Sequence, residues 1–293
     1  MSRKTFTVLG NCQAPLLADA LLSVPEFAAA YDLVKVPPIH TLKPDRIAAL
    51  HDQVLQTDLV IHQPIVNATR FGAFEIERLR AASPAGQRMI CIPSVYFNGY
   101  FPTIAALNGV GSPAMLVHDI AVFHAFMAGM PARDAARVIY REGFLPAQAI
   151  RKQWAHGLTA LAQREETFGV DVPLSEFLRD QGTEAVLMNQ FNHPRSAVFN
   201  WMGDRILERL GLTGAACDVT QKLDALKWPV MPDVRDAVGI EPGEAPEGIV
   251  VRGQTIVFED FVDQAYGFYA AADRALLDAH IELFPHVRKN LPV

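Results

Sequence analysis

The stretch TFTVLGNCQAPLLADALL, residues 5–22, carries the clearest structural signal of the chain. Residues 5–9 are strand formers, and residues 14–22 carry the apolar spacing of a helix. The sequence therefore predicts a strand, a tight turn at residues 10–13 (GNCQ) and a helix. Cys12 in that turn would lie at the positive end of a helix dipole. That position lowers a thiol pKa and offers backbone N–H groups to an oxyanion.

Residue types alone leave two interpretations of Cys12 open. In the first, Cys12 is a nucleophile, and the amides of Asn11 and Gln13 stabilise an oxyanion or position the reacting groups. In the second, its thiol is a small apolar group packed under a tight turn, as buried cysteines commonly are. Features elsewhere in the sequence have to decide between them.

Composition limits the class of protein. The chain has 293 residues, of which 50% are hydrophobic, enough to bury a substantial core. A net charge of −6 and a pI of about 5.8 argue against non-specific nucleic-acid binding. The three cysteines, Cys12, Cys91 and Cys217, have no CxxC spacing, so neither a zinc site nor a disulfide framework is expected.

The first residues are not expected to form an export signal. After the basic pair Arg3 and Lys4, the apolar run is interrupted at Gly10, which is too short for a signal sequence. No apolar run reaches the length needed to span a membrane. We therefore expect a soluble cytoplasmic protein without a transmembrane segment, and its oligomeric state stays open.

The first third of the chain alternates strand-like and helix-like segments. Strands are expected at residues 5–9, 32–36, 58–62 and 88–92, and helices at residues 14–22, 44–56 and 74–82. This rhythm is typical of a parallel sheet covered by helices.

The remainder of the chain is expected to be mostly helical. Helices are expected at residues 120–130, 132–142, 147–164, 174–179, 196–210 and 258–283, and a surface connection at residues 228–246. We therefore predict an α/β fold, with a mainly parallel sheet in the N-terminal third and a large helical remainder. It would form one domain over residues 1–293, divided into a sheet-forming half at 1–115 and a mostly helical half at 116–293.

Polar residues follow three of the expected strands. The turn at residues 10–13 follows the first strand, His62 and Gln63 end the third, and the segment 93–100 (PSVYFNGY) follows the fourth. Ligands of open parallel sheets collect at the carboxyl ends of the strands. The residues expected to contact substrate or cofactor at this edge are Gly10, His62, Gln63, Ser94, Tyr96 and Asn98.

A cysteine nucleophile needs a base, normally a histidine. His193 is the best candidate, because Pro194 follows it and keeps the segment non-helical there. Asn192 or Asn189 is expected to position the ring, with the more distant Asp119 as an alternative. His118 is the second choice for the base. The sequence has no metal signature, no GxGxxG after the first strand and no P-loop lysine motif. No metal cofactor or dinucleotide is therefore expected.

These segments resemble the WcbI family, proposed acetyltransferases of bacterial capsule polysaccharide biosynthesis. The resemblance is carried by GNCQ at residues 10–13, by PSVYFNGYFP at residues 93–102 and by Asn-His-Pro at residues 192–194. It covers roughly residues 5 to 210. A more distant likeness to SGNH hydrolases and acyltransferases exists, but here cysteine replaces serine. An amide also stands where an acid is expected, so the third member of a triad stays open.

The resemblance implies acetyl transfer from acetyl-coenzyme A to a sugar hydroxyl, with Cys12 and His193 as catalytic residues. In a covalent version Cys12 takes the acetyl group, whereas in direct transfer it only positions the reactants. The coenzyme A phosphates would need cations, for which Arg88, Arg195 and Lys222 are candidates.

Two other functions remain open. A thiol hydrolase, acting as an esterase or amidase, would use the same pair with water as the acceptor. A non-catalytic carbohydrate-binding protein would use the aromatic side chains of residues 96–100.

Overall fold

The computed structural model describes residues 3–214, 216–220, 223–241 and 247–292. The chain divides into two compact units. Unit 1 comprises residues 1–95, 160–176 and 194–222, and unit 2 comprises residues 96–159, 177–193 and 223–293. This division does not follow the expected halves, because segments of the second half belong to unit 1. The grouping of all residues into one domain stays a prediction.

Unit 1 is built on a parallel sheet with the strand order β2-β1-β3-β4. Its strands are β1 (Lys4–Leu9), β2 (Tyr31–Leu33), β3 (Leu59–His62) and β4 (Arg88–Cys91). β3 is buried along its whole length, as expected for an apolar strand covered on both faces. All four predicted strands are therefore confirmed. β2 ends early, although the Val34 N–H still donates to the Phe6 carbonyl, and two prolines follow.

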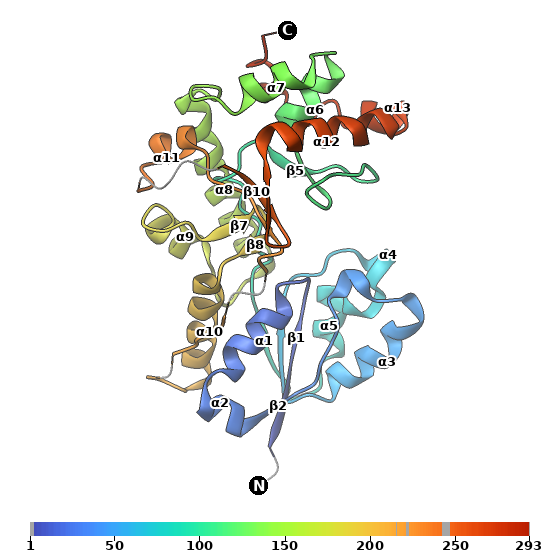
Figure 1. Cartoon of the computed structure of the whole chain (residues 1–293). Coiled ribbons are helices and arrows are strands. Elements are labelled where there is room, and N and C mark those ends of the chain that lie inside the picture. Colours follow the sequence, from blue (N-terminus) through green and yellow to red (C-terminus); the bar gives the residue numbers. More distant parts are fainter. Residues whose placement is uncertain (1–2, 215, 221–222, 242–246, 293) are drawn as a thin grey trace. The chain divides into compact units, whose positions relative to one another are not determined.

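Helices cover both faces of this sheet (Figure 1). On one face α1 (Ala14–Leu22) packs against α10 (Ser196–Leu210). On the other lie α3 (Pro44–Leu55) and α5 (Ile76–Ala82). Their side chains form one apolar cluster with the sheet, which includes Leu9, Leu50, Val54, Val60, Phe74 and Leu79. The layered arrangement predicted for this part of the chain is confirmed.

The local sequence explains where α1 and α10 begin and end. Pro15 lies in the first turn of α1, where its missing N–H is not needed. Ser23 ends that helix, and its hydroxyl donates to the Ala20 carbonyl at 2.6 Å. Gly211 ends α10 in the left-handed conformation with φ 83°, which glycine adopts without strain. Both helices match their predicted ranges.

Unit 2 contains a group of packed helices. α6 (Ile120–Met127), α7 (Ala132–Ile139) and α12 (Phe258–Ala271) contact one another. The Tyr269 ring lies at the centre of this group, in contact with the rings of Phe123 and Phe126. The other helices of the chain are α2 (Pro25–Ala30), α4 (Ala68–Phe71), α8 (Ala147–Phe168), α9 (Ser175–Gln181), α11 (Pro232–Val238), α13 (Arg274–Asp278) and α14 (Pro285–Arg288), with 3-10 turns η1 (Ile39–Thr41) and η2 (Gly72–Phe74).

Unit 2 also contains strands that the sequence analysis missed. A three-stranded antiparallel sheet has the order β11-β10-β9, and two further pairs are β5 with β6 and β7 with β8. Their bounds are β5 (Ile104–Ala106), β6 (Val117–Asp119), β7 (Met188–Gln190), β8 (His193–Pro194), β9 (Leu226–Lys227), β10 (Gly248–Val251) and β11 (Gln254–Val257). The turn between β10 and β11 is Arg252 and Gly253, both with positive φ, which matches the twist of a hairpin.

Two other expectations for unit 2 are corrected. The single helix predicted for residues 258–283 is wrong, because α12 ends at Ala271 and Ala272 is extended. Asp273 then starts α13, its carboxylate accepting the Ala275 N–H at 2.8 Å. The surface connection predicted at residues 228–246 contains α11 and the buried Trp228, whose ring contacts Phe261, while residues 242–246 lie outside the described part.

The predicted fold class is confirmed: the protein is α/β, with a parallel sheet in the N-terminal third and a largely helical remainder. Within the described residues, no helix combines the length and the apolar character needed to cross a bilayer.

Candidate active site

The three predicted polar segments meet at one edge of the sheet in unit 1. Leu9 of β1 pairs with His62 of β3, and His62 pairs with Cys91 of β4. Because all three strands are parallel, the residues that follow them emerge side by side at the carboxyl edge. The turn at residues 10–13, Gln63 and the segment from residue 93 to residue 95 therefore form one polar cluster.

Cys12 lies in the turn between β1 and α1, two residues before the helix begins. Its side chain is half-buried, and this burial raises the pKa of the Cys12 thiol, while its own backbone N–H acts in the opposite direction. The expectation of a lowered pKa is therefore wrong for this structure, because desolvation of the thiolate outweighs the local donors. A thiol in this environment needs a general base to become a nucleophile.

Gln13 is buried, and its side-chain amide binds the segment after β4. Its Nε2 donates to the Val95 carbonyl at 2.9 Å, and its Oε1 accepts the Val95 N–H at 3.1 Å. The Gln13 amide thus exchanges two hydrogen bonds with the Val95 backbone, as two backbone residues of neighbouring strands do. The amide of Gln13 is therefore engaged in joining the turn after β1 to the chain after β4.

Gln63 is also buried and joins all three segments. Its Oε1 accepts the Asn11 N–H at 2.8 Å, and its Nε2 donates to Gln13 Oε1 at 2.9 Å and to the Pro93 carbonyl at 3.3 Å. Gly10 lies so close that an added Cβ would be 2.5 Å from Gln63 Oε1. The glycine of the GNCQ turn is thus required by the close approach of this side chain.

Asn11 stabilises the start of the turn toward α1. Its Oδ1 accepts the Gln13 N–H at 2.9 Å, and its carbonyl accepts the Ala14 N–H at 3.1 Å. This is an Asx turn, in which the side chain replaces a backbone acceptor. The bond directs the other end of the amide, Nδ2, away from the Gln13 N–H, so Nδ2 is the side-chain donor that Asn11 can offer to a reacting group.

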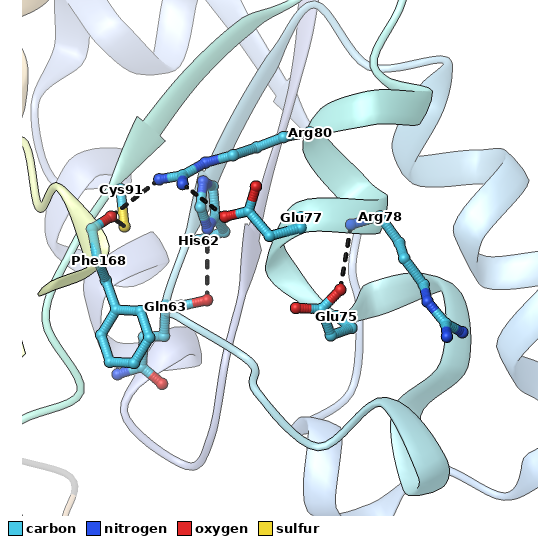
Figure 2. A network of polar contacts seen from close by, with 8 residues as sticks. All are labelled: His62, Gln63, Glu75, Glu77, Arg78, Arg80, Cys91 and Phe168. Carbon is cyan, nitrogen blue, oxygen red and sulfur yellow. Dashed lines mark hydrogen bonds and ion pairs between the residues drawn. The ribbon is translucent and has the colours of Figure 1, made fainter.

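His62 and Cys91 lie side by side beneath this edge and are both buried. Burial lowers the pKa of His62 to about 4 and raises the pKa of Cys91 to about 11. Figure 2 shows His62 facing the Gln63 carbonyl, 3.3 Å from Nδ1. Arg80 donates to the Phe168 carbonyl at 2.9 Å, and the Cys91 sulfur lies 4.0 Å from the same oxygen. His62 is thus a neutral imidazole inside unit 1.

The predicted base belongs to unit 2. His193 begins the short strand β8 and is half-buried, and burial lowers the pKa of its imidazole. A lowered pKa leaves this ring neutral at pH 7, which is the form that accepts a proton. The preceding Asn192 accepts a hydrogen bond at its Oδ1 from Gln190 Nε2 at 2.5 Å.

Aromatic residues after β4 lead into unit 2. Tyr96 is 43% exposed, and its ring is stacked near Phe191 with a centroid distance of 6.4 Å. The neighbouring Phe97 N–H donates to the Phe191 carbonyl at 2.7 Å, which fixes this segment beside the one that carries His193. Asn98 is half-buried, and its carbonyl accepts the Phe101 N–H in a turn.

The predicted residues are thus distributed over both units. Unit 1 holds Gly10, Asn11, Cys12, Gln13, His62, Gln63, Ser94 and Arg195, and unit 2 holds Tyr96, Asn98, Asn192 and His193. Ser94 is half-buried, and Arg195 is exposed at the start of α10. The pairing of Cys12 with His193 stays a prediction.

The candidate phosphate-binding cations differ in position. Arg88 is the first residue of β4, so it lies at the opposite edge of the sheet from Cys12, and it donates to the Arg209 carbonyl. Arg195 precedes α10, and Lys222 lies outside the described residues. Among the residues that the structure describes, no group of three or more His, Cys, Asp or Glu side chains is arranged to hold a metal ion.

Two polar residues that the sequence places near the candidate base or its orienting group, Gln190 and Asp119, are buried in unit 2. Gln190 is buried in β7, and its Oε1 has no hydrogen-bond partner within the described structure. Asp119 caps α6, accepting the Ala121 N–H at 2.9 Å and the Tyr140 hydroxyl at 3.1 Å, and burial raises its pKa to about 6. An aspartate directly before an apolar helix is a cap signal that the sequence does carry.

A cysteine on the turn between the first strand of a parallel sheet and the first helix defines an α/β protein with a candidate thiol nucleophile. The family model described as polysaccharide biosynthesis enzyme WcbI matches residues 5–215. The chain therefore belongs to the WcbI family of polysaccharide biosynthesis enzymes.

A solved structure of WcbI has the same fold. Its TM-score is 0.88 at 22% sequence identity, covering 99% of this chain and 98% of that chain. That structure is described as WcbI, a novel polysaccharide biosynthesis enzyme, in a native form without a disulfide bond between coenzyme A and one of its cysteines. None of the curated proteins compared with this chain matches it.

Proposed function

We propose that this enzyme transfers an acetyl group from acetyl-coenzyme A to a sugar hydroxyl, with Cys12 as the nucleophile and His193 as the general base. The observation that carries the proposal is the position of Cys12 at the carboxyl edge of the sheet, in a turn held by two buried glutamine side chains. The description of the WcbI structure, which concerns coenzyme A and a cysteine, supports the donor.

In the first half of the proposed reaction, the thioester is exchanged. Neutral His193 takes the proton of the Cys12 thiol, and the sulfur attacks the carbonyl carbon of acetyl-coenzyme A. The Asn11 amide stabilises the tetrahedral oxyanion. The bond to the coenzyme A sulfur then breaks, and that sulfur takes the proton from His193. One thioester replaces another, so this step is nearly isoenergetic.

In the second half, the acceptor receives the acetyl group. His193 takes the proton of a sugar hydroxyl, whose oxygen attacks the acetyl carbon on Cys12. The Cys12 sulfur leaves and is protonated by His193, which restores the starting state. The raised pKa of the Cys12 thiol and the lowered pKa of His193 favour transfer of the thiol proton during the attack of the sulfur, since neither charged form is stabilised beforehand.

A carbohydrate-binding role without catalysis is the second candidate, and the exposed ring of Tyr96 is the observation that favours it. Aromatic faces stack on the apolar faces of sugar rings, and Tyr96 presents 43% of its surface to solvent. Sugar binding that survives loss of Cys12 and His193, without binding of coenzyme A, would favour this role.

Product analysis separates transfer from hydrolysis. The wild-type enzyme with acetyl-coenzyme A and a sugar acceptor should give the acetylated sugar, with slower release of acetate when the acceptor is omitted. Equal rates of coenzyme A release with and without acceptor would instead show a thiol hydrolase. Cys12→Ala and His193→Ala should each abolish transfer, whereas Cys217→Ala, a buried cysteine in the same unit, is the control. Full activity in both Cys12→Ser and Cys12→Ala would rule out nucleophilic catalysis.

A further inference from the structure

Two buried glutamines of unit 1, Gln13 and Gln63, form a network of hydrogen bonds with each other and with the surrounding backbone. Gln13 and Gln63 come from different parts of the chain, yet their amides bond to each other at 2.9 Å. Each is almost fully buried, and each also binds the backbone of the segment after β4. We call this arrangement, Gln13 with Gln63, the amide latch. It joins the ends of three adjacent strands.

We infer that Gln63 is a positioning residue that sets the accessibility and the placement of the Cys12 thiol through the turn at residues 10–13. The inference concerns how the thiol is held, and only its kinetic test rests on the proposed acetyl transfer. Gln63 does not itself touch Cys12 in this assignment. It acts through the Asn11 N–H on one side of the cysteine and through Gln13 on the other.

The hydrogen-bonding capacity of Gln63 explains why this position requires an amide. Its Oε1 accepts from Asn11, and its two N–H groups serve Gln13 and the Pro93 carbonyl. A glutamate would keep the bond to Asn11 but would place an acceptor against two other acceptors. An alanine would leave buried backbone groups without partners. We therefore assign Gln63 to positioning, although the sequence suggested that it contacts substrate or cofactor.

Gly10 provides independent evidence for the same contact. The carboxamide of Gln63 fills the space that a Cβ at residue 10 would need, with Oε1 at 2.5 Å and Cδ at 2.8 Å. Gly10 is the first residue of the turn. The turn can lie this close to the Gln63 side chain because residue 10 has no Cβ. The two residues should therefore be energetically coupled.

The first test measures the thiol without using any substrate. In the Gln63→Ala variant the turn loosens, the Cys12 thiolate is better solvated, and its alkylation by iodoacetamide at pH 7 should become roughly three to ten times faster. Peptide mass spectrometry identifies the alkylated cysteine in the intact chain. The matched control is Gln87→Ala, since Gln87 Nε2 donates to the carbonyls of Val54 and Thr57, both at 2.8 Å, before β4 begins. An unchanged alkylation rate in Gln63→Ala would overturn the inference.

The second test is a double-mutant cycle. Gly10→Ala alone should lower the melting temperature and change the alkylation rate of Cys12, because its Cβ meets Gln63. In the Gln63→Ala background, the same Gly10→Ala change should lower the melting temperature by less and should change the alkylation rate of Cys12 by less. Equal effects of Gly10→Ala on both quantities in the two backgrounds would show that the contact between Gly10 and Gln63 does not hold the turn, and would contradict the inference.

A third measurement covers the case in which Gln63→Ala does not fold. In the wild-type protein, the Asn11 N–H bonded to the buried Oε1 of Gln63 should exchange with deuterium slowly. Rapid exchange of that amide would count against the latch.

The kinetic test applies once transfer by the wild-type enzyme is observed. Gln63→Ala should then lower kcat by about tenfold to a hundredfold with little change in KM for acetyl-coenzyme A, because a slightly misplaced nucleophile loses rate more than affinity. The thiol would thus react faster with a small reagent and slower in transfer, a combination that unfolding does not produce. A changed KM with unchanged kcat would contradict positioning. If the wild-type enzyme transfers no acetyl group, the proposed function fails while the alkylation and coupling tests still decide the inference.

Discussion

At the scale of single residues, the two proposed catalytic groups, Cys12 in unit 1 and His193 in unit 2, are both half-buried. Burial raises the pKa of the Cys12 thiol and lowers the pKa of the His193 imidazole. Both shifts favour the uncharged form, since a charge loses hydration in a partly buried position. The Cys12 thiol and the His193 imidazole are therefore each expected to be uncharged at pH 7.

The pH dependence of transfer should reflect these groups. Because the pKa of His193 is lowered, this proposed base stays neutral at pH 7 and is protonated only below the ordinary imidazole value of about 6.5. The rate of transfer should therefore be level near neutrality and decline only in more acidic solution. A pH profile of kcat/KM checks this, and an acid limb centred above pH 7 would contradict it.

The buried His62 should make folding sensitive to acid. Its pKa is about 4 in the folded protein and about 6.5 when unfolded, so below pH 6.5 the unfolded chain binds a proton that the folded chain excludes. The free energy of unfolding should fall as the pH decreases from 6.5 to 4, by at most about 3 kcal/mol from this group.

A comparison with His62→Gln isolates this contribution. The variant should lose part of the acid sensitivity in denaturant titrations, whatever its stability at pH 7. Asp119 acts with the opposite sign, because its raised pKa of about 6 makes its contribution fall as the pH rises from 3.8 to 6. An identical pH dependence in wild type and His62→Gln would refute the assignment.

At the scale of elements, the first strand, its turn and its helix could be predicted almost residue by residue. The apolar run of β1 favours a strand, the glycine favours a turn, and the leucines of α1 favour a helix. These local preferences are all consistent with the observed fold. The hairpin of β10 and β11 was missed, because the usual turn signal is absent from its first turn position. Its turn uses Arg252 in a positive-φ conformation, where glycine, asparagine or aspartate is the usual signal.

Two glycines of unit 2 provide a test of these assignments. Gly253 in the β10–β11 turn has φ 81°, so Gly253→Ala should destabilise the protein by about 1 kcal/mol. Gly267 lies inside α12 with nothing within 4 Å of an added Cβ, so Gly267→Ala should stabilise it by about 0.5–1 kcal/mol. Denaturant titrations of both variants measure the difference. The same sign for both would mean that one of the two elements is wrongly assigned.

At the scale of the whole molecule, the sequence identified the fold class and the edge of the sheet that carries the polar cluster. It could not show that Gln13 and Gln63 bond to each other, because 50 residues separate them and only the strand order brings them together. It also suggested Gln63 and His62 as contacts to ligand, whereas both are buried and bonded within unit 1. Burial depends on packing between distant segments, which residue types alone do not specify.

Coenzyme A binding belongs to this scale as well. The proposed donor predicts that titration of the full chain with coenzyme A gives a saturable heat signal and a raised melting temperature, because a ligand that binds the folded state stabilises it. Cys12→Ala should still bind coenzyme A, since the nucleophile contributes to the chemistry more than to affinity. No binding at millimolar concentration would exclude the coenzyme A donor.

We propose that Cys12 carries the acetyl group during transfer, and intact-mass spectrometry after brief incubation with acetyl-coenzyme A, without acceptor, can detect this intermediate. We expect a mass gain of one acetyl group that maps to Cys12, persists in Cys217→Ala, is absent in Cys12→Ala and disappears when the sugar acceptor is added. Transfer to the sugar at the wild-type rate with no acetyl group ever found on Cys12 would contradict it.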